Sequence, residues 1–128
     1  MKTRPIVYVA HPYGGKRDNL LSAIAWLRFL RDSFDDCDFT APWIANCIAD
    51  PFEDNTATRA RALAFDQEMV RRCDQLWAVG ERVSPGMSLE ITAAIEAGRP
   101  WINATGFALH VSQHELIVEA IKARRARS

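Results

Sequence analysis

Two carboxylates in this sequence could do chemistry because each occurs within an apolar helical stretch. Glu90 lies near the start of a predicted helix rich in alanine and isoleucine, and Asp66 follows the apolar run that ends at Phe65. A carboxylate among apolar residues costs free energy unless it is paired or faces a cleft. Held beside C1′ of a sugar, an ionised carboxylate can act as a nucleophile or stabilise an oxocarbenium ion. The simpler alternative is that Glu90 satisfies a helix dipole and that Asp66 lies on an exposed face.

Two glycine-containing loops could hold a ligand beside these carboxylates. The first, His11–Arg17, reads HPYGGKR, follows a predicted strand and precedes a helix. Glycine lets the backbone approach a ligand closely, and the amides at a helix N-terminus attract anions. The second loop covers residues 80–87 and reads GERVSPGM. In it, Ser84 and the amides near Gly86 could hydrogen-bond a phosphate. Neither loop carries a dinucleotide or Walker fingerprint, so an ordinary turn explains the first loop equally well.

Apolar periodicity predicts strands and helices that alternate along the chain. Strands are predicted at residues 5–10, 39–41, 75–79 and 100–104. Helices are predicted at residues 19–34 and 56–72, from the end of the 80–87 loop to 97, and at 112–125, where Ser112–Glu115 has the form of a capping box. Residues 42–55 are predicted to be a loop with room for one helical turn.

This alternation favours an α/β fold with a doubly wound parallel sheet, Rossmann-like or flavodoxin-like, of about four to five strands with helices on both faces. Ligands bind such sheets beyond the carboxyl ends of the strands, where the strand order reverses. Both loops follow strands, so they are expected at that edge. The expected domain organisation is one domain over residues 1–128.

Composition narrows the classes of partner and location. Sixteen basic residues balance sixteen acidic ones, so nothing calls for nucleic acid or an anionic membrane as partner. The N-terminal apolar run is too short for a signal peptide, and the separated cysteines Cys37, Cys47 and Cys73 are typical of reduced thiols in the cytoplasm. His110 and His114 are four residues apart but lack the glutamate of H-E-x-x-H, so no metal site is expected.

Four segments together resemble the nucleoside 2-deoxyribosyltransferase superfamily, and most closely its branch of 2′-deoxynucleoside 5′-monophosphate N-glycosidases. They are YVAHPYGG from Tyr8, Asp66 in AFDQEMVRRCDQLW, the S-x-G-x-x-x-E run from Ser84 to Glu90, and AAIEAGRP from Ala93. Each motif alone is short, but the four occur in family order and span most of the chain. The region after Trp101 carries little of the resemblance.

The resemblance implies roles for the residues at matching positions. Glu90 would be the nucleophile, Asp66 the acid/base residue, and Tyr8 a neighbour of the catalytic glutamate. The predicted substrate-binding residues are His11, Tyr13, Gly14, Gly15, Arg17, Ser84 and Gly86.

Two positions bear on the 5′ end of the substrate. Ser84 stands where the nucleoside transferases carry an aspartate, and a serine there resembles the monophosphate branch because it does not repel an anion. Tyr13 stands where that branch has an arginine, so Lys16 or Arg17 would have to replace the charge. Trp43 is expected either in the core or stacked on a base.

The expected function is cleavage or transfer at the N-glycosidic bond of a 2′-deoxynucleoside or its 5′-monophosphate through Glu90, with no metal or organic cofactor. The partner would be a small nucleoside or nucleotide, and the resemblance implies a homo-oligomer, often with sites completed by a neighbouring copy. Two alternatives stay open because they need the same cradle. One is a non-catalytic nucleotide-binding or sensor domain, and the other is a hydrolase of another ribosyl nucleotide.

Overall fold

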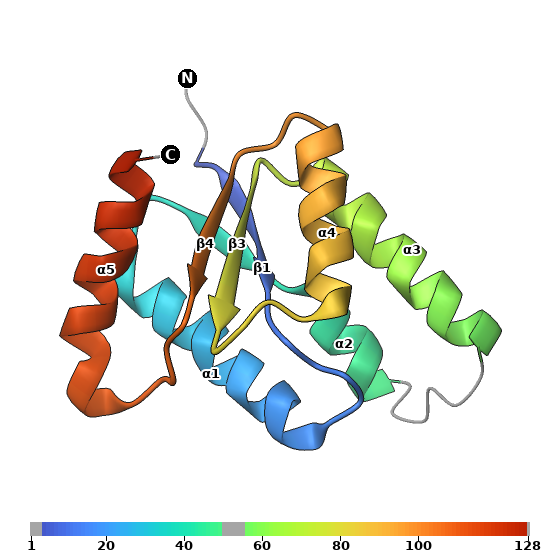
Figure 1. Ribbon diagram of the computed structural model, residues 1–128, viewed down its shortest axis with the longest axis horizontal. Helices are drawn as coiled ribbons and strands as arrows, with labels where there is room; N and C mark the ends of the chain where they lie inside the picture. The colour runs from blue at the N-terminus through green and yellow to red at the C-terminus, as the bar shows by residue number, and fades with distance from the viewer. Residues whose placement is uncertain (1–3, 50–55, 128) are drawn as a thin grey trace.

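The computed structural model describes residues 4–49 and 56–127, and its described part is built on a four-stranded parallel sheet (Figure 1). The strands are β1 (Ile6–Ala10), β2 (Asp38–Thr40), β3 (Gln75–Gly80) and β4 (Trp101–Thr105). They lie in the order β2-β1-β3-β4, with Tyr8 of β1 paired to Thr40 on one side and Leu76 on the other. The order therefore reverses at β1, which confirms the predicted doubly wound parallel sheet.

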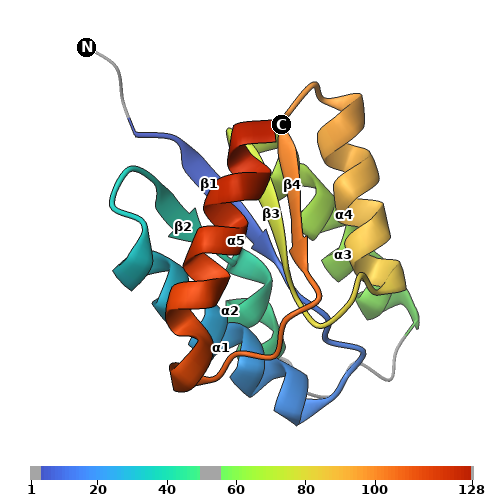
Figure 2. The ribbon, with the colours of Figure 1, turned by 60° about the vertical axis from the view of Figure 1, so that its left-hand side comes forward.

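Helices cover both faces of this sheet, as Figures 1 and 2 show. They are α1 (Arg17–Ser33), α2 (Pro42–Ala49), α3 (Thr56–Arg72), α4 (Pro85–Glu96) and α5 (His114–Arg127), the last preceded by a 3-10 turn at Val111–Gln113. Helices α1 and α5 lie on one face, and α3 and α4 pack side by side on the other. Because both faces are covered, Val7, Tyr8, Val9 and Ala10 of β1 are all buried.

The predicted loop at 42–55 is wrong in its first part. Residues Pro42–Ala49 form helix α2, and residues 50–55 lie outside the described residues. Proline is well suited to the first turn of a helix, where its missing N–H costs nothing. Trp43 then anchors the helix, because its indole Nε1 donates a 3.0 Å hydrogen bond to the backbone oxygen of Val9 at the end of β1. The helix therefore closes one side of the sheet's carboxyl edge.

Other boundaries also differ from the prediction: α1 begins at Arg17 and not at residue 19, and β2 covers Asp38–Thr40 and not residues 39–41. Helix α4 begins at Pro85, so the loop after β3 is shorter than residues 80–87. Ser112 lies inside the 3-10 turn and helix α5 begins at His114, so the predicted capping box does not start that helix. The ring of His114 packs on Phe29 with 4.6 Å between ring centroids.

The described residues include no helix long and apolar enough to cross a bilayer. Over the same residues, no group of three or more histidine, cysteine, aspartate or glutamate side chains is arranged to hold a metal ion.

Candidate active site

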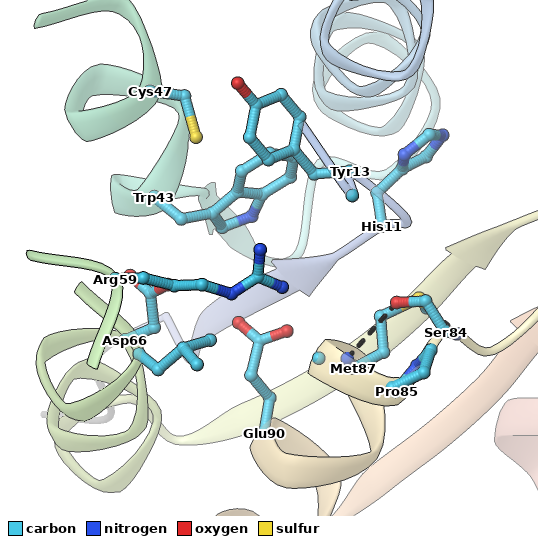
Figure 3. A pocket seen from close by; sticks show the side chains of 13 residues that line it. His11, Tyr13, Trp43, Cys47, Arg59, Asp66, Ser84, Pro85, Met87 and Glu90 are labelled. Atoms are coloured by element: carbon cyan, nitrogen blue, oxygen red, sulfur yellow. Dashed lines mark hydrogen bonds between the residues drawn. The ribbon is translucent and has the colours of Figure 1, made fainter. Parts of the chain in front are cut away.

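A cavity of about 250 Å³ opens at the carboxyl edge of the sheet, where β1 and β3 end against helices α2, α3 and α4 (Figure 3). It is lined by His11, Tyr13, Gly14, Trp43, Cys47, Arg59, Leu63, Asp66, Ser84, Pro85, Gly86, Met87 and Glu90. Residues from the segments that follow β1 and β3 and from α2, α3 and α4 therefore line one cavity. It lies at the edge of the sheet where ligands bind doubly wound folds.

Glu90 is the buried carboxyl of this cavity. It lies in the second turn of α4 on the face that also buries Met87, Ile91 and Ala94, and only 8% of its surface is exposed. The hydroxyl of Tyr8, fully buried on β1, donates a hydrogen bond to Glu90 Oε2. This bond fixes one carboxyl oxygen, and Figure 3 shows the carboxyl group directed into the cavity.

Burial sets the protonation state of this pair. It raises the pKa of Glu90 from its ordinary value of 4.5 to about 8; the Tyr8 hydrogen bond opposes that shift and the negative charge of Asp66 adds to it. The pKa of Tyr8 is also raised well above its usual range, by burial and then by the charges of Glu90 and Asp66. Both groups therefore hold their protons at neutral pH. The sequence predicted an ionised Glu90, and desolvation in the second turn of α4 reverses that expectation.

Asp66 comes to the same cavity from α3, which packs along α4. Its charge acts on both Tyr8 and Glu90. The structure thus brings together the three residues predicted to be catalytic. Carboxyl groups that share one pocket tend to titrate apart, which is the arrangement that separates acid, base and nucleophile roles.

Ser84 begins helix α4 at the other side of the cavity. Its Oγ accepts a 3.3 Å hydrogen bond from the Met87 backbone N–H, and the Ser84 N–H donates to the Met87 sulfur at 3.3 Å. Gly86 lies in the first turn, and both residues line the cavity. Ser84 therefore has a capping role that sequence analysis did not assign to it, in addition to its place in the cavity wall.

The loop after β1 supplies His11, Tyr13 and Gly14 to the cavity. The His11 ring points away from Glu90 in Figure 3, and its two nitrogens lie 2.7 Å from the oxygen of Pro12 and 3.0 Å from Ser22 Oγ. Burial lowers the pKa of His11, so the ring is neutral, with the proton on the nitrogen that faces the carbonyl. These two hydrogen bonds hold the ring within the fold.

Comparison with known proteins places the chain in a family. Residues 5–104 match the family described as "Domain of unknown function (DUF7768)". The chain belongs to this family. Among solved structures, that of a 2-deoxyribosyltransferase from the psychrotolerant bacterium Bacillus psychrosaccharolyticus matches with a TM-score of 0.57 and 19% identity, over 84% of this chain and 78% of that one. No curated protein matches the chain. The DUF7768 domain therefore has a fold like that of the 2-deoxyribosyltransferase.

Some predicted binding residues of this DUF7768 domain do not line the cavity. Gly15 and Arg17 are exposed, and neither belongs to its wall; the same is true of Lys16. Gly15 adopts a φ of 75° and helps turn the chain into α1, which begins at Arg17. The wall therefore takes no charge from Lys16 or Arg17, which the sequence had offered as replacements for the arginine missing at position 13.

Sequence analysis missed the cation that the structure brings to the wall, Arg59 of α3. Arg59, Leu63 and Asp66 are separated by four and three residues, so they share one face of the helix. This spacing was the signal available in the sequence. Trp43 and Cys47 of α2 complete that side of the cavity, and both are buried.

Proposed function

We propose that this protein binds a 2′-deoxynucleoside or its 5′-monophosphate in the cavity and breaks its N-glycosidic bond, passing the sugar to water or to a second base. The observation that carries this proposal is the buried Glu90 carboxyl, bonded to the Tyr8 hydroxyl and placed in one cavity with Asp66. The fold shared with a 2-deoxyribosyltransferase supports it. Two carboxyl groups at one pocket are what retaining glycosidases use.

In the first step, a carboxylate oxygen of Glu90 bonds to C1′ while the C1′–N bond breaks. The electron pair of that bond leaves with the base, and Asp66, which has taken the proton that Glu90 gave up, passes it to the base. In the second step, Asp66 takes a proton from water as the water oxygen bonds to C1′, and the ester bond to Glu90 breaks. A second base can take the place of water and lose its proton to Asp66. Two inversions at C1′ give overall retention.

Glu90 must lose its proton before it can attack. That proton passes to Asp66, so the competent pair still holds one proton. Because the pKa of Glu90 is about 8, the pair keeps this proton at neutral pH and loses it at higher pH, where kcat/KM should fall. The oxocarbenium-like transition state then places positive charge beside the carboxylate and favours its ionised form. Tyr8 has the role of a positioning residue that holds one oxygen while the other faces the sugar.

The orientation of the substrate follows from the two ends of the cavity. The 5′ end would lie toward Gly14, Ser84 and Gly86, where a serine and the amino end of α4 suit a phosphate. This placement supports the monophosphate branch of the superfamily.

We also propose a single domain over residues 1–128, a homo-oligomer in the cytoplasm, and activity without a metal or organic cofactor.

A second candidate is a nucleotide-binding domain that does not cleave its ligand. The observation that favours it is the protonated state of Glu90 at neutral pH, since a neutral carboxyl is a poor nucleophile and a good hydrogen-bond donor. Such a domain would be stabilised by ligand without forming product.

The two candidates are separated by one experiment. The protein is incubated at about pH 7, below the Glu90 pKa of about 8, with a panel of deoxynucleosides and their monophosphates, with and without a free base, and released or exchanged base is measured by chromatography. Mass spectrometry of acid-quenched samples then looks for a deoxyribosyl ester on Glu90. We expect base release and the ester with wild-type protein and Glu96→Ala, and neither with Glu90→Ala. Thermal stabilisation without product would support the binding domain, and activity that survives Glu90→Ala would refute the nucleophile.

A further inference from the structure

Arg59 brings a positive charge to a wall that otherwise carries acidic, neutral and apolar groups. Among the described residues that line the cavity, it is the one lysine or arginine. Figure 3 shows its guanidinium extending across the cavity between Trp43 and the carboxyl group of Glu90. Within residues 4–49 and 56–127, no hydrogen bond or ion pair engages that guanidinium. Its N–H groups can therefore donate to a bound molecule.

The position of Arg59 relative to Glu90 indicates which part of a substrate it would meet. Ser84 and Gly86 lie at the amino end of α4, whereas Arg59 and Leu63 come from α3. Figure 3 shows the carboxyl group of Glu90 between Ser84 and Arg59. With C1′ at Glu90 and the 5′ end beside Ser84, the base extends toward α3. The indole of Trp43 and the Leu63 side chain supply apolar surface there, which suits a flat heterocycle.

The chemistry of bond breaking gives the guanidinium a use at this end. When the C1′–N bond breaks, its electron pair moves onto the ring nitrogen and spreads to a carbonyl oxygen wherever the base has one. A guanidinium N–H directed at that oxygen forms a charge-assisted hydrogen bond that strengthens as negative charge develops. An exocyclic amino group at the same place is a donor and would face another donor.

From this arrangement we infer that Arg59 is a specificity-determining residue that reads a carbonyl group on the departing base, so that the protein prefers oxo-bases to amino-bases. The inference rests on the proposed function for the orientation of the substrate. It adds the class of base, which neither the sequence motifs nor the fold assigns. The proton that completes the departing base still comes from Asp66, so Arg59 donates hydrogen bonds and keeps its charge throughout.

Deoxyinosine and deoxyadenosine test this inference because their bases differ at position 6, where one has a carbonyl oxygen and the other an amino group. Wild type is compared with Arg59→Gln, Arg59→Lys and the matched control Arg61→Gln, an exposed arginine of α3 outside the cavity. For Arg59→Gln we expect kcat/KM on deoxyinosine to fall by roughly 10- to 100-fold, with a change below about threefold on deoxyadenosine. Arg59→Lys should fall between wild type and Arg59→Gln, and Arg61→Gln should match wild type.

Equal losses on both nucleosides would overturn the inference while leaving the proposed function intact. A loss confined to 5′-monophosphates of either base would also overturn it, because Arg59 would then read the phosphate.

If wild type releases no base at all, the proposed function fails and binding decides the inference. Calorimetry with hypoxanthine and adenine should then show tighter hypoxanthine binding to wild type and no such preference in Arg59→Gln. Equal affinities, or no binding of either base, would reject the role of Arg59. Thermal unfolding of each variant confirms that it is folded.

Discussion

Two cavities formed by described residues open at the carboxyl edge of the sheet, one on each side of the β1 loop, and they differ in how far they bury their ionisable groups. The first, of about 250 Å³, holds Glu90 with 8% of its surface exposed. The second, of about 310 Å³, lies against α1 and the loops after β3 and β4, and its acidic residues Asp18 and Glu81 are exposed. His11 lines both. Cavity size alone therefore does not mark the site; the withdrawal of a carboxyl group from water does.

The largest expected effect comes from exchanging one glutamate in each cavity. Glu90→Gln keeps the size of the side chain but removes the nucleophile, so kcat/KM for base release should fall by about 10³-fold or more. Glu81→Gln, in the second cavity, should leave kcat/KM within about twofold, as expected for an exposed residue away from the reacting atoms. Equal losses in the two variants would show that the first cavity has no special role.

The same two variants should differ in how stability depends on pH. In the folded state Glu90 keeps its proton up to about pH 8, whereas in the unfolded chain it loses that proton near 4.5. The folded state thus binds more protons between these values, and stability falls as the pH rises through that window. Glu90→Gln removes this decline, so its free energy of unfolding relative to wild type should rise by about 3 kcal/mol between about pH 5 and pH 7.5.

Chemical denaturation at several pH values measures this difference, with Glu81→Gln as the control. That variant should follow the wild-type pH dependence because Glu81 is exposed. A parallel pH dependence of wild type and Glu90→Gln would mean that Glu90 is ionised in the folded protein.

The aspartates of the two cavities provide the next comparison. Asp66→Asn removes the group that we assign to proton transfer and should lower kcat by about 10²-fold on substrates with poor leaving groups. Asp18→Asn, in the second cavity, should leave kcat unchanged. A base activated by a stronger electron-withdrawing group needs less protonation, so the loss caused by Asp66→Asn should shrink with it. A constant loss across leaving groups would assign Asp66 to binding.

Removing the hydroxyl of Tyr8 tests what holds Glu90 in place. The hydrogen bond from Tyr8 lowers the pKa of Glu90, so Tyr8→Phe should move the fall of kcat/KM at alkaline pH to higher pH. At neutral pH the variant should lose roughly 10-fold in kcat/KM, because Glu90 gives its proton to Asp66 less readily, and this loss should shrink in alkaline buffer. A pH profile that stays in place with a lower plateau would mean that Tyr8 acts on the substrate directly.

How far the sequence predicted these features depends on whether the signal is local. The β-branched run that ends at Ala10 and the alternation of elements predicted the parallel sheet, because burial of strands on both faces leaves a continuous apolar run. Glu90 and Asp66 were found because carboxylates interrupt apolar helices. Helix α2 was missed because Pro42 and Pro51 were read as loop formers, although Pro42 occupies a position where a helix accepts proline.

Other features depend on contacts that no local pattern records. The protonation of Glu90 follows from packing between α4, β1 and α3, which sets the depth of burial. Arg59 is an exposed residue on a helix with several arginines, and only its spacing to Leu63 and Asp66 distinguishes it from Arg61. Likewise, Lys16 and Arg17 were attractive from their place beside two glycines, yet the turn at Gly15 carries them away from the cavity wall.

The smallest expected effects concern one serine in each cavity, and each serine hydroxyl makes a hydrogen bond within the fold. Ser22 Oγ lies 3.0 Å from the His11 ring, and Ser84 Oγ caps α4 through the Met87 N–H. Ser22→Ala and Ser84→Ala should each lower the free energy of unfolding by about 1 kcal/mol. Only Ser84→Ala should also raise KM, by a few-fold, and more for a 5′-monophosphate than for its nucleoside, because Ser84 lies where the 5′ end is proposed to bind. Denaturation curves and initial rates on both substrates measure the two effects. A rise in KM for Ser22→Ala of the same size would show that the His11 loop, which lines both cavities, transmits changes from one to the other.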